Sequence, residues 1–219
     1  GTNDYMTRGA GLTGAADGKK GIVSFWADSA ADGITGMYIR DALSHTIIFI
    51  NTSNKVNVLL TYAAGGTAVN KSSTPAFTTT SGWFHVIASW DSAANDFKMY
   101  INDGSEAPSA PADGDIDYKE TDGGIGARTN GTHIITCDMS EIYVNTAEYL
   151  DISVTANRRK FIDASGKPVD LGSDGSTPTG ASPLIYLPNP FGTLEQNEGT
   201  GGDFTVTGVL TACAGSPSD

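Results

Sequence analysis

Short segments of strand-like composition recur along this chain at intervals of about ten residues, with Gly, Asn or Asp turn signals between them. Helical patterns do not alternate with these segments, so a βαβ architecture is not expected. The spacing predicts an all-β protein, an antiparallel sandwich or barrel. The expected strands cover residues 21–27, 36–40, 46–50, 55–62, 83–90, 96–102, 124–126 and 139–144, and Tyr5-Met6 indicates the end of another.

The length of 219 residues suits one domain with a sizeable core, so we expect a single domain over residues 1–219. Residues 163–202 are rich in Gly, Pro, Ser and Asp and predict an extended, ordered surface loop. Because loops of this length are uncommon and are usually functional, this segment is also the expected partner-binding segment. A closing strand is expected at 203–212, followed by a loose tail at 214–219.

One short helix is expected, at residues 153–162. Ser153 can cap its N-terminus, and Val154 and Phe161 would share one face. The basic residues that end the segment suit the negative end of the helix dipole.

The charge of the chain excludes two classes of partner. The net charge is −12 and the pI is near 4.4. Nucleic acid is not expected as a ligand, because binding to phosphates depends on Lys and Arg. No polybasic anchor and no apolar run of about 18 residues is present, so membrane insertion is not expected. The sequence starts at Gly1 without a Met, so we expect residues upstream of it, and no leader indicates a localisation.

Cys137 and Cys213 are the two cysteines, too few for a disulfide framework. Two free thiols and one long-range disulfide both remain open.

The strand order carries a family resemblance through five segments: Phe25-Trp26, Trp83-Phe84-His85-Val86, Met99-Tyr100-Ile101-Asn102-Asp103-Gly104, Gly124-Ile125-Gly126 and Ser140-Glu141-Ile142-Tyr143-Val144. Over residues 1–150 and the last strand, the chain resembles the concanavalin A-like lectin/glucanase superfamily, in its laminin-G-like and pentraxin-like branch. The resemblance implies an antiparallel jelly-roll β-sandwich.

A narrower resemblance lies in Asn157–Asp163, Gly166–Gly172 and Gly175–Gly180. These segments are similar to concanavalin A-like proteins of tailed phages and prophages. That implies a non-enzymatic structural or adhesion protein on the virion surface, a capsid or tail component such as a decoration, spike or fibre. The implied partners are other virion proteins, copies of this chain and a host surface glycan. The alternatives are a free, secreted carbohydrate-binding module and a glycoside hydrolase.

Hydrolysis of glycans needs two carboxylates facing one cleft, which members of this superfamily supply from an E-x-D-x-(x)-E run. This sequence has no such run. Asp115-Ile116-Asp117 lies in a polar loop, and Glu141 is wrongly spaced from Asp138 for one strand face. We therefore expect no enzyme activity, with Asp115→Asn and Glu141→Gln as the variants that would test for it.

Two kinds of ligand contact are expected in the loops. Related lectin-like folds bind calcium through loop oxygens, and Asp113, Asp115, Asp117 and Asp122 lie close together in this sequence. Calcium is therefore the one cofactor to test, by a rise in melting temperature when it is added. Tyr62, Tyr118 and Tyr186 near loops are candidates for stacking on a sugar.

Overall fold

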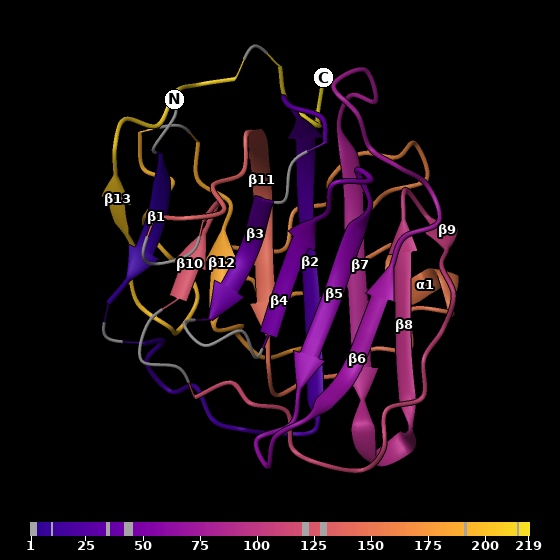
Figure 1. The fold of residues 1–219 in the computed structure, drawn as a ribbon. Helices are drawn as coiled ribbons and strands as arrows, with labels where there is room; N and C mark the ends of the chain where they lie inside the picture. Colours follow the sequence, from indigo (N-terminus) through magenta and orange to yellow (C-terminus); the bar gives the residue numbers. More distant parts are fainter. Residues whose placement is uncertain are drawn as a thin grey trace.

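A computed structural model describes residues 4–9, 11–33, 36–41, 46–119, 123–127, 131–190, 192–213 and 215–219. Two antiparallel sheets pack face to face, which confirms the all-β jelly-roll prediction (Figure 1). In the view of Figure 1, strands β3 to β6 of one sheet cross in front of β2, β7 and β8 of the other.

The front sheet has seven strands in the order β13-β1-β10-β3-β4-β5-β6. Its strands are β1 (Tyr5–Arg8), β3 (Gly36–Asp41), β4 (Thr46–Ile50), β5 (Val56–Thr61), β6 (Thr67–Ser72), β10 (Gly123–Ile125) and β13 (Thr205–Thr207). The back sheet has six strands in the order β12-β11-β2-β7-β8-β9. Its strands are β2 (Lys20–Ser29), β7 (Phe84–Asp91), β8 (Asp96–Ile101), β9 (Gly104–Ser105), β11 (Cys137–Asn145) and β12 (Ile185–Leu187).

The main core fills the space between the sheets. Alternate residues point inward, such as Val23 and Phe25 of β2 and Val58 and Leu60 of β5. Trp90 at the end of β7 is 1 % exposed and lies over Gly21, its cross-strand partner. A Cβ on Gly21 would lie 2.2 Å from the indole Cζ2, so only glycine leaves room for the ring.

A second apolar cluster lies on the outer face of the six-stranded sheet. It joins strand residues such as Ile22, Ile87 and Tyr143 to Ile152 and Phe161. We call residues 149–183, which supply the covering side of this cluster, the outer layer. In Figure 1 these orange segments pass behind β7 and β8. Strands β2 and β7 are therefore buried on both faces, which explains their nearly continuous apolar runs.

The helix expected at 153–162 is much shorter, because α1 covers only Thr155–Arg158. The Ser153 hydroxyl donates to Asp151 Oδ1 at 2.6 Å and does not cap the helix. Val154, expected on the packed face, is 48 % exposed, whereas Phe161 is buried in the outer cluster. The helix therefore begins after Ser153, without a side-chain cap, and covers about one turn.

Several predicted boundaries change at the C-terminal end. The closing strand is β13, three residues long, within the expected 203–212. The loop expected at 163–202 contains β12, which pairs with β11. In the tail expected to be loose, Lys167 Nζ donates to the carbonyl oxygen of Ser218 at 2.7 Å, and Asp219 closes a turn on Ser216. The Lys167 bond attaches the last residues to the outer layer, and the Ser216–Asp219 bond lies within the tail itself.

Candidate functional site

A cavity of about 320 Å³ opens between the two sheets at one end of the sandwich. Met6 of β1 and Ile125 of β10 line it from one sheet, and Met139 and Ile142 of β11 line it from the other. Residues 210–213 and 215–217, which we call the tail segment, contribute much of the remaining wall. Figure 1 shows the C-terminus at this end, above β2 and β11.

The cavity combines an apolar floor with polar and aromatic groups. The floor residues belong to the main core, whereas Trp83 is half-buried and lines the wall. Asn189 also lines it, with its amide nitrogen donating to Gln196 O at 3.0 Å and to Glu198 Oε1 at 3.1 Å. These two bonds fix the amide and leave its carbonyl oxygen as an acceptor. The size and composition are those of a small-ligand site.

Both cysteines line this cavity, and both are free thiols. Cys137 on β11 packs against the main core, whereas Cys213 is exposed on the tail segment. Burial raises the pKa of the Cys137 thiol well above its usual value, and the charges of Asp138 and Asp28 add to this. Neither position was predicted to belong to a site.

The structure describes three of the four aspartates expected to bind calcium. Asp113 forms an ion pair with Lys19 at 2.7 Å, and Asp115 is exposed. Asp117 lies beyond the buried Ile116, which bridges to Gly18 and Tyr62. Asp122 lies outside the described residues. Within the described ranges, no group of three or more His, Cys, Asp or Glu side chains is arranged to hold a metal.

The three tyrosines expected to stack on a sugar do not form one site, and two of them are corrected to core residues. Tyr118 is 6 % exposed; its hydroxyl accepts from Trp90 Nε1 at 2.7 Å and donates to Lys20 O at 2.8 Å. Tyr186 is 2 % exposed in the outer cluster. Tyr62 is half-buried, and its hydroxyl donates to Ala112 O at 2.8 Å. Burial leaves Tyr118 and Tyr186 no free ring face.

Of the described carboxylates considered for hydrolysis, Asp138 lines the cavity and the others do not. Glu141 lies in a bulge of β11 with φ at 52°, and neither it nor Asp115 lines the cavity wall. Burial, and then the charge of Asp170, raises the pKa of Glu141 to about 7. This carboxylate is perturbed, but it lies outside the cavity, whereas a glycosidase needs two carboxylates that face one cleft.

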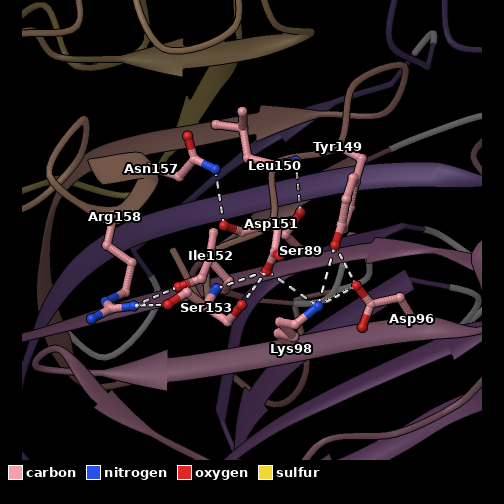
Figure 2. Close-up of polar contacts among 10 residues, drawn as sticks. All are labelled: Ser89, Asp96, Lys98, Tyr149, Leu150, Asp151, Ile152, Ser153, Asn157 and Arg158. Atoms are coloured by element: carbon pink, nitrogen blue, oxygen red, sulfur yellow. Dashed lines mark hydrogen bonds and ion pairs between the residues drawn. The ribbon is translucent and has the colours of Figure 1, made fainter. Parts of the chain in front are cut away.

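A polar network binds the outer layer to the six-stranded sheet (Figure 2). Lys98 of β8 forms an ion pair with Asp96 and lies 3.3 Å from both Tyr149 Oη and Asp151 Oδ1. Although burial opposes it, hydrogen bonding to these three groups raises the pKa of Lys98. Burial, and then Asp96, raises the pKa of Tyr149 to about 12. Ser89 Oγ accepts from Leu150 N at 3.2 Å.

Arg158 makes the second attachment of this layer. Its Nη1 donates to the carbonyl oxygens of Ile152 at 2.7 Å and Ser153 at 3.1 Å, as Figure 2 shows. Its guanidinium lies 4.3 Å from the Tyr100 ring centroid and pairs with Asp103, which also binds Arg159 at 2.6 Å. These contacts explain why Arg158 and Arg159 are partly buried and do not serve only the helix dipole.

Comparison with solved structures confirms the fold. A Bacteroides ovatus protein inferred to bind carbohydrate superposes with a TM-score of 0.65 and 16 % identity, over 95 % of this chain and 57 % of its own. Laminin α1 domains LG4-5 of mouse superpose with a TM-score of 0.50 and 20 % identity, over 68 % of this chain and 41 % of theirs. The botulinum neurotoxin serotype G binding domain superposes with a TM-score of 0.50 and 10 % identity, over 68 % of this chain and 40 % of its own.

This chain therefore spans a little over half the length of the Bacteroides protein. No protein-family model and no curated protein matches the sequence. No helix in the described part of the chain is long and apolar enough to cross a bilayer. At these identities the comparisons establish the architecture alone, an antiparallel jelly-roll sandwich.

Proposed function

We propose that this chain is a non-enzymatic, glycan-binding adhesion module displayed on the surface of a tailed-phage particle. The observation that supports glycan binding is the cavity between the sheets, where the half-buried Trp83 and the fixed amide of Asn189 line a largely apolar wall. The superposition with the Bacteroides protein over nearly the whole chain supports the same class of ligand.

The chemistry of the wall suits a sugar. Each pyranose ring has an apolar face of C–H groups and a rim of hydroxyls, so it is bound by an aromatic face together with amide and carboxylate groups. Trp83 supplies the aromatic surface, the Asn189 carbonyl accepts a hydroxyl proton, and Ser140 and Asp4 also line the cavity. The wall contains no Lys, Arg or His among the described residues, so a neutral glycan fits better than an anionic one.

The virion location is supported by the similarity of segments within 157–180 to phage-encoded proteins. In the fold, these segments form part of the outer layer, so one face of the sandwich is already covered. Display in many copies, as a homo-oligomer beside other virion proteins, would make weak binding at each site effective through avidity.

Glycan binding is tested by titrating the full chain with a panel of neutral and anionic oligosaccharides. We expect saturable binding to a neutral glycan, reduced at least tenfold by Trp83→Ala and much less by Trp83→Phe. Tyr62→Ala, which removes another half-buried aromatic ring that does not line the cavity, serves as the matched control. Saturable binding that Trp83→Ala leaves unchanged would reject this cavity as the site.

The virion location is tested separately, by quantitative mass spectrometry of purified particles. We expect the chain in stoichiometric amounts relative to the capsid or tail proteins. Absence from particles, together with retained glycan binding, would instead favour a free secreted lectin. Release of reducing ends from a glycan, abolished by Glu141→Gln or Asp115→Asn, would reject the non-enzymatic part of the proposal.

A further inference from the structure

The two thiols of this protein lie 76 positions apart in sequence, and the fold brings both to one small cavity. Cys137 reaches it from the first position of β11, which pairs with β2 and β12. Its neighbour Met139, two residues along the same strand, also packs on the core, so both side chains point between the sheets. Cys213 reaches the cavity from the tail segment.

The tail segment is held by few contacts. Leu210 packs partly against the core, and Gly215 approaches Trp83, where an added Cβ would lie 4.0 Å from the indole nitrogen. Beyond the segment, Lys167 binds the carbonyl oxygens of Ser218 and Asp219. Residues 211–213 are exposed, and none of them belongs to a strand. Such a segment opens at a small cost in free energy, compared with the buried strands.

We propose that Cys137 and Cys213 form a reversible disulfide that fixes the tail segment over the cavity. In the reduced protein the segment opens and closes, and ligands reach the cavity. In the oxidised protein the covalent bond keeps one wall in place. The disulfide itself does not depend on what the cavity binds, whereas its control of glycan access rests on the proposed function.

The reaction is a thiol–disulfide exchange with a small disulfide, RSSR, such as oxidised glutathione. The Cys213 thiol loses its proton, and its thiolate attacks one sulfur, forming a mixed disulfide and releasing RS⁻, which takes up a proton to become RSH. The Cys137 thiol then loses its proton, attacks the Cys213 sulfur and releases a second RSH. The two cysteine sulfurs are oxidised by two electrons in total, and one RSSR is reduced to two RSH.

The surroundings of the two thiols set the order of these steps. Cys213 is exposed and its sulfur donates to Gly215 O at 2.6 Å, so it is the accessible group. Cys137 is faced by Asp138 on its own strand and Asp28 on β2, and Asp4 and Tyr5 of β1 line the same cavity. The negative charges and burial disfavour its thiolate. The second step is therefore expected to be slow and to accelerate about tenfold per pH unit.

The experiment uses the reduced full chain, treated with oxidised glutathione, quenched with acid and mapped by mass spectrometry. We expect a transient glutathione adduct on Cys213, followed by a linkage between Cys137 and Cys213 that dithiothreitol reverses. Cys137→Ser should stop at the adduct, and Cys213→Ser should react much more slowly. The same reaction in urea gives the rate at which the disulfide closes in an unfolded chain. The rate in the native chain should be at least tenfold higher.

Two results would overturn the proposal. The first is a stable Cys213 adduct or a disulfide-linked dimer under native conditions, with the intramolecular bond forming only in urea. The second is a disulfide that forms without changing how strongly acrylamide quenches the fluorescence of Trp83. The Trp83→Phe variant identifies the part of the fluorescence that comes from Trp83. Unchanged quenching would mean that the bond forms without fixing the tail segment. Because neither readout involves a sugar, a failure of glycan binding is distinguished from a failure of this inference.

Discussion

Replacing Asp103 with Asn tests how the outer layer is attached to the sandwich. Asp103 lies in the turn between β8 and β9 with φ at 67°, where Asn is as well tolerated as Asp. The change keeps the shape of the side chain and removes only its charge. In the native protein this carboxylate pairs with Arg158, 10 % exposed in its side chain, and with Arg159 nearer the surface.

The loss of stability in Asp103→Asn is expected to come mainly from the weakened pairing with Arg158. A hydrogen bond between charged groups contributes roughly 1.5–3 kcal/mol. The Asp103 side chain is 29 % exposed, and in the variant Arg158 keeps its bonds to Ile152 and Ser153 and its contact with Tyr100. We therefore expect the free energy of unfolding to fall by about 2 kcal/mol. For a chain of this size, that corresponds to a fall in melting temperature of about 4–8 °C.

The pH dependence gives a second check. Hydrogen bonding to Arg159, opposed by burial and aided by Arg158, lowers the pKa of Asp103 below its usual 3.8. A carboxyl group whose pKa is lowered on folding stabilises the protein above its unfolded pKa, and this contribution is lost as the pH falls through the folded pKa. The difference between wild type and Asp103→Asn should therefore be constant above about pH 5 and shrink in more acid solution.

The assay is urea unfolding at several pH values, with hydrogen exchange of residues 149–183 as the local readout. Asp113→Asn, which breaks the exposed pair with Lys19, is the control and should change nothing measurable. A charged attachment through Asp103 is contradicted if Asp103→Asn is as stable as wild type at pH 7, or if the difference in stability persists unchanged below the pKa of Asp103.

Four further predictions concern the core and the site. Gly21→Ala should lower the free energy of unfolding in urea by roughly 1–3 kcal/mol, because its Cβ would overlap the Trp90 indole. Gly9→Ala is the control and should match wild type, because a Cβ there would meet nothing within 4 Å. Tyr118→Phe should lose about 1–3 kcal/mol, since it leaves the buried Trp90 N–H unpaired; an unchanged midpoint would contradict this. Folding raises the pKa of Glu141 to about 7, so the wild-type protein loses stability as the pH rises from 4.5 to 7. Glu141→Gln should therefore have a higher melting temperature than wild type at pH 8 but not at pH 4. Calcium binding at Asp113, Asp115, Asp117 and Asp122 predicts a rise in melting temperature with added calcium that EDTA reverses, and no shift would reject it.

The strands with strong apolar patterns were predictable from the sequence. The β7–β8 hairpin and the Asn102-Asp103-Gly104 turn are confirmed, because alternation and turn chemistry are local signals. Strand β6, Thr67–Ser72, was missed because its edge position leaves it polar and mostly exposed. Strand β12 was missed because three residues between prolines carry no usable period.

The site was much less predictable. The burial of Tyr118 depends on Trp90 and Lys20, which are distant in sequence, so no local signal separates it from a loop tyrosine. The cavity is assembled from β1, β10, β11, the residue before β7 and the tail segment, and its existence depends on how these pack. Two cysteines on one wall are visible only once the sheets are formed.

The antiparallel pairing of β1 with β13 has a consequence for how the protein is made. Tyr5 is the register partner of Thr207, and Arg8 Nη1 donates to the carbonyl oxygen of Asp203 at 3.0 Å. At roughly 5–20 residues per second, the ribosome needs on the order of 10–40 seconds to deliver the second partner after the first. During that interval one edge of the front sheet is unpaired and open to association with other nascent chains. Chaperone occupancy on ribosome-bound chains should therefore persist until residues 203–207 have emerged.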